Sequence, residues 1–380
     1  MFRGFRLSFG NQTAQKPISN MAVELFDSTQ DVYVEPGRQK TATEGLPPLP
    51  KKQSSILHRL NCFVSVWLLK SIARIFFIVA RFFFRPNSTN CPTLIKRYPC
   101  RPDLETRTFF PPDYYARGTP GLLPLYLDIH GGGFAICDAQ FDDRFCVSWA
   151  KRTGMIVVSL NYRKAPLHPF PTATHDVVAV ARAVLEDEFL PIDKSRVAIG
   201  GFSAGGNLAL SAAQLPGLKG IVKAVVAYYP VVDFGCPAAE KLVARRYTDG
   251  PRDVLQHVAE VFDWGYVSPG QNRRDPLLSP CYARPEDLPS WIYIIGAQWD
   301  MLRLEAQLMM HRLAGLDDRV EHLTPAFEKG NYKWTIATGC SHGFTHGLLG
   351  DLGDVVVPKE MREKIYQEAH TWLKKSVLSD

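Results

Sequence analysis

The sequence predicts an α/β protein with one mainly parallel central sheet and helices on both of its faces. Three observations lead to this fold class: apolar runs alternate with helical stretches, 380 residues can bury a large core, and the composition is globular. Hydrophobic residues make up 46% of the chain and charged residues 22%, which argues against a disordered protein. Because the net charge is only +6 and the basic residues after residue 100 are scattered, we expect no nucleic-acid partner.

Apolar, often β-branched runs mark the predicted strands. They lie at residues 122–129, 155–160, 197–199, 221–229 and 291–296, with another near Val320. Helices are expected at about 173–188, 302–313 and 359–375. The helical stretches at 55–90 and 236–270 have no place in this alternation, so we assign them to a cap above the sheet edge.

A serine between glycines follows the predicted strand at 197–199. Gly201-x-Ser203-x-Gly205 matches the nucleophile elbow, a tight strand-to-helix turn that holds a serine in strained backbone geometry. Glycine suits both flanking positions because a Cβ there would collide with the neighbouring strand and helix. We therefore predict Ser203 as a nucleophile.

A serine hydroxyl needs a base to take its proton, and that base needs an orienting acid. Such groups are expected at the carboxyl ends of strands in an open parallel sheet. Asp300 ends the strand that begins at residue 291, and His342 lies beside a glycine after the last predicted strand. We predict Asp300 as the acid and His342 as the base.

Each of these two assignments has alternatives. Asp300 could instead be the N-cap of the helix that follows it. Other acids and histidines also compete for the two roles, namely Glu305 and Asp317 for the acid and His311, His322 and His346 for the base. We favour His342 because its neighbouring glycine frees the loop to present the ring.

A glycine triplet, Gly131 to Gly133, follows the strand at 122–129 and is led by His130. In acyl transfer, the carbonyl oxygen of the substrate becomes negatively charged and is stabilised by fixed backbone N–H groups. Glycines allow the backbone to approach that oxygen closely. We favour this role for the triplet over that of a flexible loop.

Taken together, these motifs resemble the hormone-sensitive-lipase branch of the α/β-hydrolases, which includes bacterial esterases and arylacetamide deacetylases. The resemblance covers approximately residues 100–375. It rests on 130–134, 162–171, 201–206, Asp300 and 342–344. It implies an α/β-hydrolase fold with a helical cap.

The resemblance also implies residue roles. Ser203 would be the nucleophile, His342 the general base and acid, and Asp300 its orienter. The oxyanion hole would be formed by the backbone N–H groups of Gly132, Gly133 and Ala204, with His130 bracing the loop. Three features depart from the family pattern: Phe202 stands where Asp or Thr is common, the stretch after Asp300 lacks the proline and second acidic residue that often follow there, and 327–338 looks like an insertion before the base.

The resulting expectation is a serine hydrolase that cleaves carboxylic esters of lipophilic substrates with short or medium acyl groups, without a metal or organic cofactor. An amide deacetylase on the same triad, or a non-catalytic receptor on the same fold, are the alternatives. The expected partner is a small-molecule ester, and a homo-oligomer is left open. The eight cysteines show no metal-ligand spacing, so we expect free thiols and an intracellular protein, cytoplasmic or associated with a membrane such as the endoplasmic reticulum.

We divide the chain into a disordered or extended tail and linker (1–50), a hydrophobic amphipathic helical segment (51–95) and a catalytic domain (96–380) with a cap insertion at about 236–280. Residues 62–84 are the most hydrophobic part of the chain. Within 59–85, basic residues recur along one side of the expected helix, namely Arg59, Lys70, Arg74, Arg81 and Arg85. A helix packed over the active site, a helix lying on a membrane surface and a membrane span all remain open.

Overall fold

The computed structural model of the protein describes residues 55–83, 91–114, 121–245, 247, 250–346 and 356–378. The expected tail and linker at 1–50 lie outside the described residues, as do Arg85 and the side chain of Arg81. The sheet, its helices and every residue expected in the active site lie within them.

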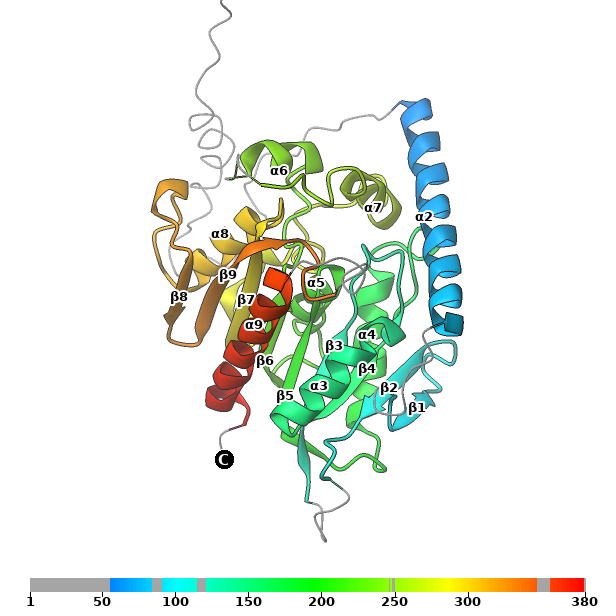
Figure 1. The fold of residues 1–380 in the computed structure, drawn as a ribbon, viewed down its shortest axis with the longest axis vertical. Helices are drawn as coiled ribbons and strands as arrows, with labels where there is room; N and C mark the ends of the chain where they lie inside the picture. Colours follow the sequence, from blue (N-terminus) through cyan, green and yellow to red (C-terminus); the bar gives the residue numbers. More distant parts are fainter. Residues whose placement is uncertain are drawn as a thin grey trace, which may run out of the picture. The chain divides into compact units, whose positions relative to one another are not determined.

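Among the described residues, the strands form one sheet in the order β1-β2-β4-β3-β5-β6-β7-β9-β8 (Figure 1). The strands are β1 (Leu94–Arg97), β2 (Glu105–Phe109), β3 (Leu123–Ile129), β4 (Ile156–Leu160), β5 (Ile192–Phe202), β6 (Val222–Tyr228), β7 (Trp291–Trp299), β8 (Ala326–Lys329) and β9 (Tyr332–Ser341). In this order, the central strands β4-β3-β5-β6-β7-β9 pair in parallel, whereas β1, β2 and β8 pair antiparallel at the two edges. The prediction of a mainly parallel sheet is confirmed.

Helices connect the strands and cover both faces of the sheet (Figure 1). The α-helices are α2 (Ile56–Phe83), α3 (Asp143–Thr153), α4 (Thr172–Leu185), α5 (Ala204–Ala212), α6 (Ala238–Ala244), α7 (Ala259–Tyr266), α8 (Arg303–Leu313) and α9 (Val356–Ser376). Short 3-10 turns lie at η3 (Ala139–Asp142), η4 (Pro280–Tyr282), η5 (Pro285–Asp287) and η6 (Val320–His322).

The alternation of side chains along each strand divides the core into two layers, because successive residues point to opposite faces. On β3, Leu125 and Leu127 pack in the layer that contains residues of α4, α5 and α8. Tyr126 lies between them in sequence and packs in the other layer, with residues of α3 and α9. The two layers together fix the central strands from both sides.

Four elements were not predicted from the sequence, namely β1, β2, α3 and β8. The edge strands β1 and β2 carry charged residues such as Lys96 and Arg107, so they lack the apolar run by which a buried strand is recognised. The amphipathic helix α3 buries Phe145 and Trp149 at a helical spacing of four residues. The predicted helical stretch at 236–270 contains α6 and α7, two short helices rather than a continuous one.

The strand predicted near Val320 is wrong, because the chain forms the 3-10 turn η6 there. The last strands lie further along, where β8 and β9 form a hairpin that includes 327–338. This segment is therefore an integral part of the sheet, and β9 pairs in parallel with β7. The turn at Gly330, with a φ of 57°, allows the chain to reverse, and the alternation of polar and apolar residues in β9 fits a strand with two different faces.

We predict that Trp334→Ala, on β9, lowers the free energy of unfolding by about 3–5 kcal/mol, because it removes a fully buried side chain from the core. Urea denaturation followed by fluorescence measures this change. The matched control is Thr338→Ala, at an exposed position on the same strand, which should change stability little. Equal stability of the two variants would contradict the place of β9 in the core.

Candidate active site

Ser203 stands at the sharp turn between β5 and α5. Its backbone has φ 53° and ψ −117°, a conformation that residues other than glycine rarely adopt. The turn is held by two backbone hydrogen bonds: the N–H of Ser203 donates to Tyr228 O at 2.9 Å, and the N–H of Asn207 donates to Ser203 O at 3.1 Å. The strained conformation places the serine at the carboxyl end of the central strands.

The glycines on either side of Ser203 are required by the close approach of two backbone segments. A Cβ on Gly201 or Gly205 would overlap the carbonyl oxygen of Ile129, at the end of β3. Neither glycine has a positive φ, so the constraint is steric space rather than backbone conformation. This agrees with the physical reason given from the sequence, and it identifies β3 as the neighbour.

Asp300 and His342 lie beside Ser203, although the three residues are far apart in the sequence. His342 Nε2 is 2.9 Å from Ser203 Oγ, and His342 Nδ1 is 2.7 Å from Asp300 Oδ2. The Asp300 side chain is fully buried, and that of His342 is 9% exposed. The arrangement is a continuous line of polar contacts from a buried carboxylate to a serine hydroxyl.

Of the two roles considered for Asp300, the N-cap is not observed, because Leu302 is the N-cap of α8 and no side chain caps that helix. Oδ2 faces His342, while Oδ1 accepts a hydrogen bond of 2.9 Å from the backbone N–H of Leu302. The second contact stabilises the turn that leads into α8. It also fixes the orientation of the carboxylate toward the imidazole.

The residues that competed with His342 and Asp300 for the roles of base and acid contact other groups. His346 Nε2 is 3.0 Å from Asp142 Oδ1, and burial lowers the pKa of His346 to about 4. Asp317 contacts His322 through its carboxylate and His311 through its carbonyl oxygen. Glu305 faces Lys241 at 2.5 Å. The structure thus brings His342 and Asp300 to Ser203 and places the alternatives elsewhere.

The glycine loop lies against the serine turn. A Cβ on Gly131 would come within 2.9 Å of Phe202 O and 3.5 Å of Ser203 Cβ. Gly132 and Gly133 have φ values of 100° and 57°, which favour glycine. Among the described residues, the N–H groups of Gly132 and Gly133 donate no backbone hydrogen bond outside the helices and strands.

His130 is fully buried beneath this loop. Its ring stacks on Tyr162 at a centroid distance of 4.5 Å, and its Nδ1 is 2.8 Å from Gly131 O. The Tyr162 hydroxyl donates to His130 O at 3.2 Å. Burial holds the pKa of His130 well below its usual range, so the ring is neutral. These contacts give His130 a supporting position without contact to Ser203 Oγ.

Two supporting residues near His342 and Asp300 were missed from the sequence. Asp253 Oδ2 accepts a hydrogen bond of 2.6 Å from the N–H of Met301, next to Asp300, and burial followed by the Asp300 carboxylate raises the pKa of Asp253. Gln298 Oε1 accepts a 2.7 Å hydrogen bond from the N–H of Gly339, in the segment that leads to His342. The position of Gln298 two residues before Asp300 was a usable signal, but Asp253 lies in a loop without any motif.

Phe202, unexplained from the sequence, packs in an aromatic cluster under the site. Its ring stacks on Tyr228 at 4.7 Å and meets Phe145 edge-on at 4.9 Å and His346 at 4.3 Å. It is 2% exposed. A large apolar ring at this position therefore fills the core behind the serine turn rather than facing a substrate.

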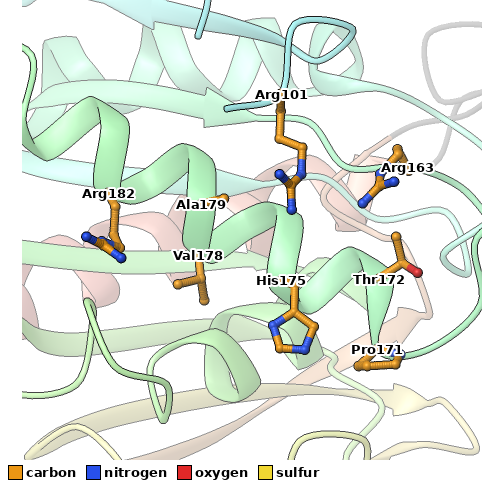
Figure 2. A pocket seen from close by; sticks show the side chains of 8 residues that line it. All are labelled: Arg101, Arg163, Pro171, Thr172, His175, Val178, Ala179 and Arg182. Atoms are coloured by element: carbon orange, nitrogen blue, oxygen red, sulfur yellow. The ribbon is translucent and has the colours of Figure 1, made fainter. Parts of the chain in front are cut away.

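A surface pocket of about 540 Å³ lies along α4. Figure 2 shows its lining residues, which are Arg101, Arg163, Pro171, Thr172, His175, Val178, Ala179 and Arg182. Arg101 and Arg163 both pair with the buried carboxylate of Asp176, which balances one of their two positive charges. Among the described residues, no group of three or more His, Cys, Asp or Glu side chains could hold a metal ion.

We predict that Gly205→Ala strongly destabilises the protein, because the new methyl group would meet the backbone of Ile129 and His130, which cannot move aside as a side chain can. The expected loss is about 1–3 kcal/mol or more, measured by thermal or urea unfolding. Gly121→Ala is the matched control, since nothing lies within 4 Å of its added Cβ. Equal stability of the two variants would show that the turn can relax.

The chain is 36% identical over 125 residues to neutral cholesterol ester hydrolase 1 of Mus musculus, which covers 30% of this chain and 31% of that protein. It is 34% identical over 167 residues to ethyl acetate hydrolase of Pseudomonas putida, covering 42% of this chain and 50% of that protein. The chain thus spans a third to a half of these relatives.

A solved structure and a family match support the fold. The hyperthermophilic esterase of the archaeon Pyrobaculum calidifontis superposes with a TM-score of 0.62 at 24% identity, covering 85% of this chain and 99% of that one. The sequence pattern of the alpha/beta hydrolase fold family matches residues 126–325, more than half of the chain. The chain belongs to the alpha/beta hydrolase fold family.

Proposed function

We propose that the protein is a serine hydrolase that cleaves carboxylic esters through an acyl-enzyme intermediate. The observation that carries the proposal is the line of contacts from Asp300 through His342 to Ser203, with distances of 2.7 and 2.9 Å. In this arrangement, the proton of the Ser203 hydroxyl points to His342 Nε2, and His342 Nδ1–H donates to Asp300. Asp300 thereby sets the tautomer of the ring and stabilises the imidazolium that forms.

In the first half of the reaction, Ser203 Oγ attacks the ester carbonyl carbon while its proton passes to His342 Nε2. The tetrahedral intermediate collapses, and His342 returns the proton to the leaving alcohol. In the second half, His342 takes a proton from water, whose oxygen attacks the acyl carbon. Collapse releases the carboxylic acid as the proton returns to Ser203. Each half therefore begins and ends with a neutral imidazole.

The developing oxyanion would be held by the backbone N–H groups of Gly132, Gly133 and Ala204. Gly132 and Gly133 belong to a loop whose N–H groups are not used in backbone hydrogen bonds among the described residues outside the helices and strands. Ala204 is the first residue of α5, where N–H groups have no partner within the helix. The proximity of Gly131 to Ser203 Cβ supports this placement.

An apolar surface beside the glycine loop supports a lipophilic substrate with a short or medium acyl group. The ring of Phe262, on α7, lies so close to Gly133 that a Cβ on that glycine would overlap it. Tyr266, on the same helix, stacks on Phe134 at 3.7 Å. Aromatic rings at these positions restrict the volume next to the oxyanion site and exclude water from it. The names of the two relatives, a cholesterol ester hydrolase and an ethyl acetate hydrolase, support the ester class. The esters that these two names specify differ in size.

An amide deacetylase on the same residues and a non-catalytic receptor on the same fold are the alternatives to esterase activity. A receptor would not need an aligned base and acid, so the contacts of His342 favour catalysis. We also propose the domain division made from the sequence: a tail and linker (1–50), a hydrophobic helical segment (51–95) and a catalytic domain (96–380) with a cap at about 236–280. Strand β1 starts at Leu94, so the described sheet begins slightly before that boundary.

We predict that Ser203→Ala lowers kcat for p-nitrophenyl butyrate by about 10⁴-fold or more, because no other group in the described part of the chain is placed against His342 to form the acyl-enzyme. The matched control is Ser195→Ala, at an exposed position near the start of the same strand, which should retain activity. Circular dichroism checks that both variants fold. Turnover retained in folded Ser203→Ala would refute the assignment, and wild-type turnover of anilides but not esters would favour the deacetylase.

We predict that Phe262→Ala shifts the preferred acyl length of p-nitrophenyl esters upward, because it enlarges the apolar space next to Gly133. The measurement is kcat/KM across a series from acetate to palmitate. Val254→Ala, at an exposed position in the same region, is the control and should leave the profile unchanged. A profile for Phe262→Ala that matches wild type would mean that the acyl chain lies elsewhere.

A further inference from the structure

We propose that the exposed face of α2 docks on an anionic lipid surface, with the helix lying along that surface. The inference rests on the proposed function for its consequence, which is delivery of lipophilic esters to the site. The docking itself depends only on the contacts and the exposed side chains of this helix. Ile56–Phe76 is long and apolar enough to cross a membrane by length and composition alone, so its contacts must decide how it meets lipid.

The outer face of α2 is mainly apolar, with Asn61 and Ser71 as exposed polar residues within it. Its members are large side chains that are 47–84% exposed, namely Ile56, Leu57, Leu60, Phe63, Val64, Leu68, Ile72, Ile75, Ile78 and Val79. At about 100° per residue they fall on one broad side of the helix. Exposed apolar surface of this extent is rare on proteins that remain in water and marks an interaction site.

The opposite side of α2 is fixed to the protein. Cys62 and Val66 are buried, and Val66 Cγ2 lies against Gly265 of α7, within 3.6 Å of where a Cβ would be. Lys70 Nζ donates a 2.6 Å hydrogen bond to Ala165 O, in the loop after β4. A membrane-spanning helix would have to give up these contacts, whereas a helix lying on the surface keeps them.

The charges on α2 select the kind of surface. The helix contains no Asp or Glu, and Arg59 and Arg74 are exposed on the same border of the apolar face. Basic residues along the edge of an apolar face are attracted by anionic headgroups. A second copy docking through the same face would bring these arginines together without an acidic partner on either helix. Charge complementarity therefore favours anionic lipid over a homodimer.

The docking face is connected to the catalytic loop through α7. Phe63 of α2 meets Trp264 of α7 edge-on at 6.3 Å, and the neighbouring Phe262 covers Gly133. Figure 1 shows α2 beside α7. A lipid surface bound by α2 is thus separated from the glycine loop by α2 itself and by α7.

The test is flotation of the full chain with vesicles of phosphatidylcholine, with and without phosphatidylserine. We expect wild type to bind the anionic vesicles, and Leu60→Glu combined with Ile75→Glu to weaken binding about ten-fold or more, because both charges lie on the docking face. The matched control is Leu122→Glu combined with Phe189→Glu, two exposed apolar residues outside α2. Arg59→Gln combined with Arg74→Gln should reduce the preference for phosphatidylserine.

Hydrolysis of water-soluble p-nitrophenyl butyrate is measured in parallel and should be the same in all these variants. This separates the two proposals, since Ser203→Ala should float normally while losing turnover. Wild type that binds neither vesicle, or a Leu60/Ile75 variant that binds as wild type does, would overturn the docking proposal. Extraction by detergent but not by carbonate would also overturn the docking proposal, because that result indicates a membrane-spanning helix. So would a wild-type dimer that becomes a monomer in the Leu60/Ile75 variant when no vesicle binding is observed.

Discussion

The close approach of three backbone segments around Ser203 is the constraint on which the site depends. The end of β3 occupies the space that a side chain at position 201 or 205 would need, so strand, turn and helix can meet only where glycine is present. The same contact brings Gly131 against Ser203. The serine proposed as the nucleophile and the loop proposed to hold the oxyanion are therefore positioned by one steric fit, with the strained backbone of Ser203 maintained by its hydrogen bonds to Tyr228 and Asn207.

The rest of the fold holds the remaining groups against this turn. β7 and β9 pair in parallel, and their register shifts between Ala297 and Trp299, just before Asp300. Gln298 then links the end of β7 to Gly339, which fixes the segment before His342. Behind the turn, Phe202 and His346 pack in a buried aromatic cluster, so the loop that carries His342 is anchored on its inner side. Packing in the core therefore helps to fix the orientation of the His342 imidazole.

The helices α2 and α7 extend the same contacts outward. α7 places aromatic rings on the glycine loop, and α2 buries one side on α7 while its other side remains apolar and exposed. A helix that was used only to complete the core would be expected to have a polar outer face. The two sides of α2 therefore suit two different environments: one side packs on α7, and the other side is apolar and exposed.

The sequence by itself determined the fold class, the central strands, the serine turn and the residues placed around it, because each depends on local patterns of apolar residues and glycine. It did not determine the last strand, which was predicted near Val320 and lies at Tyr332–Ser341, since this half-polar strand of an edge hairpin has no continuous apolar run. Only the tertiary structure decided which face of α2 is buried, the core position of Phe202 and the contact of Asp253 with the turn after Asp300. These depend on pairs of residues far apart in the chain, as Phe202 and His346 are. Such contacts arise from packing and leave no local signal.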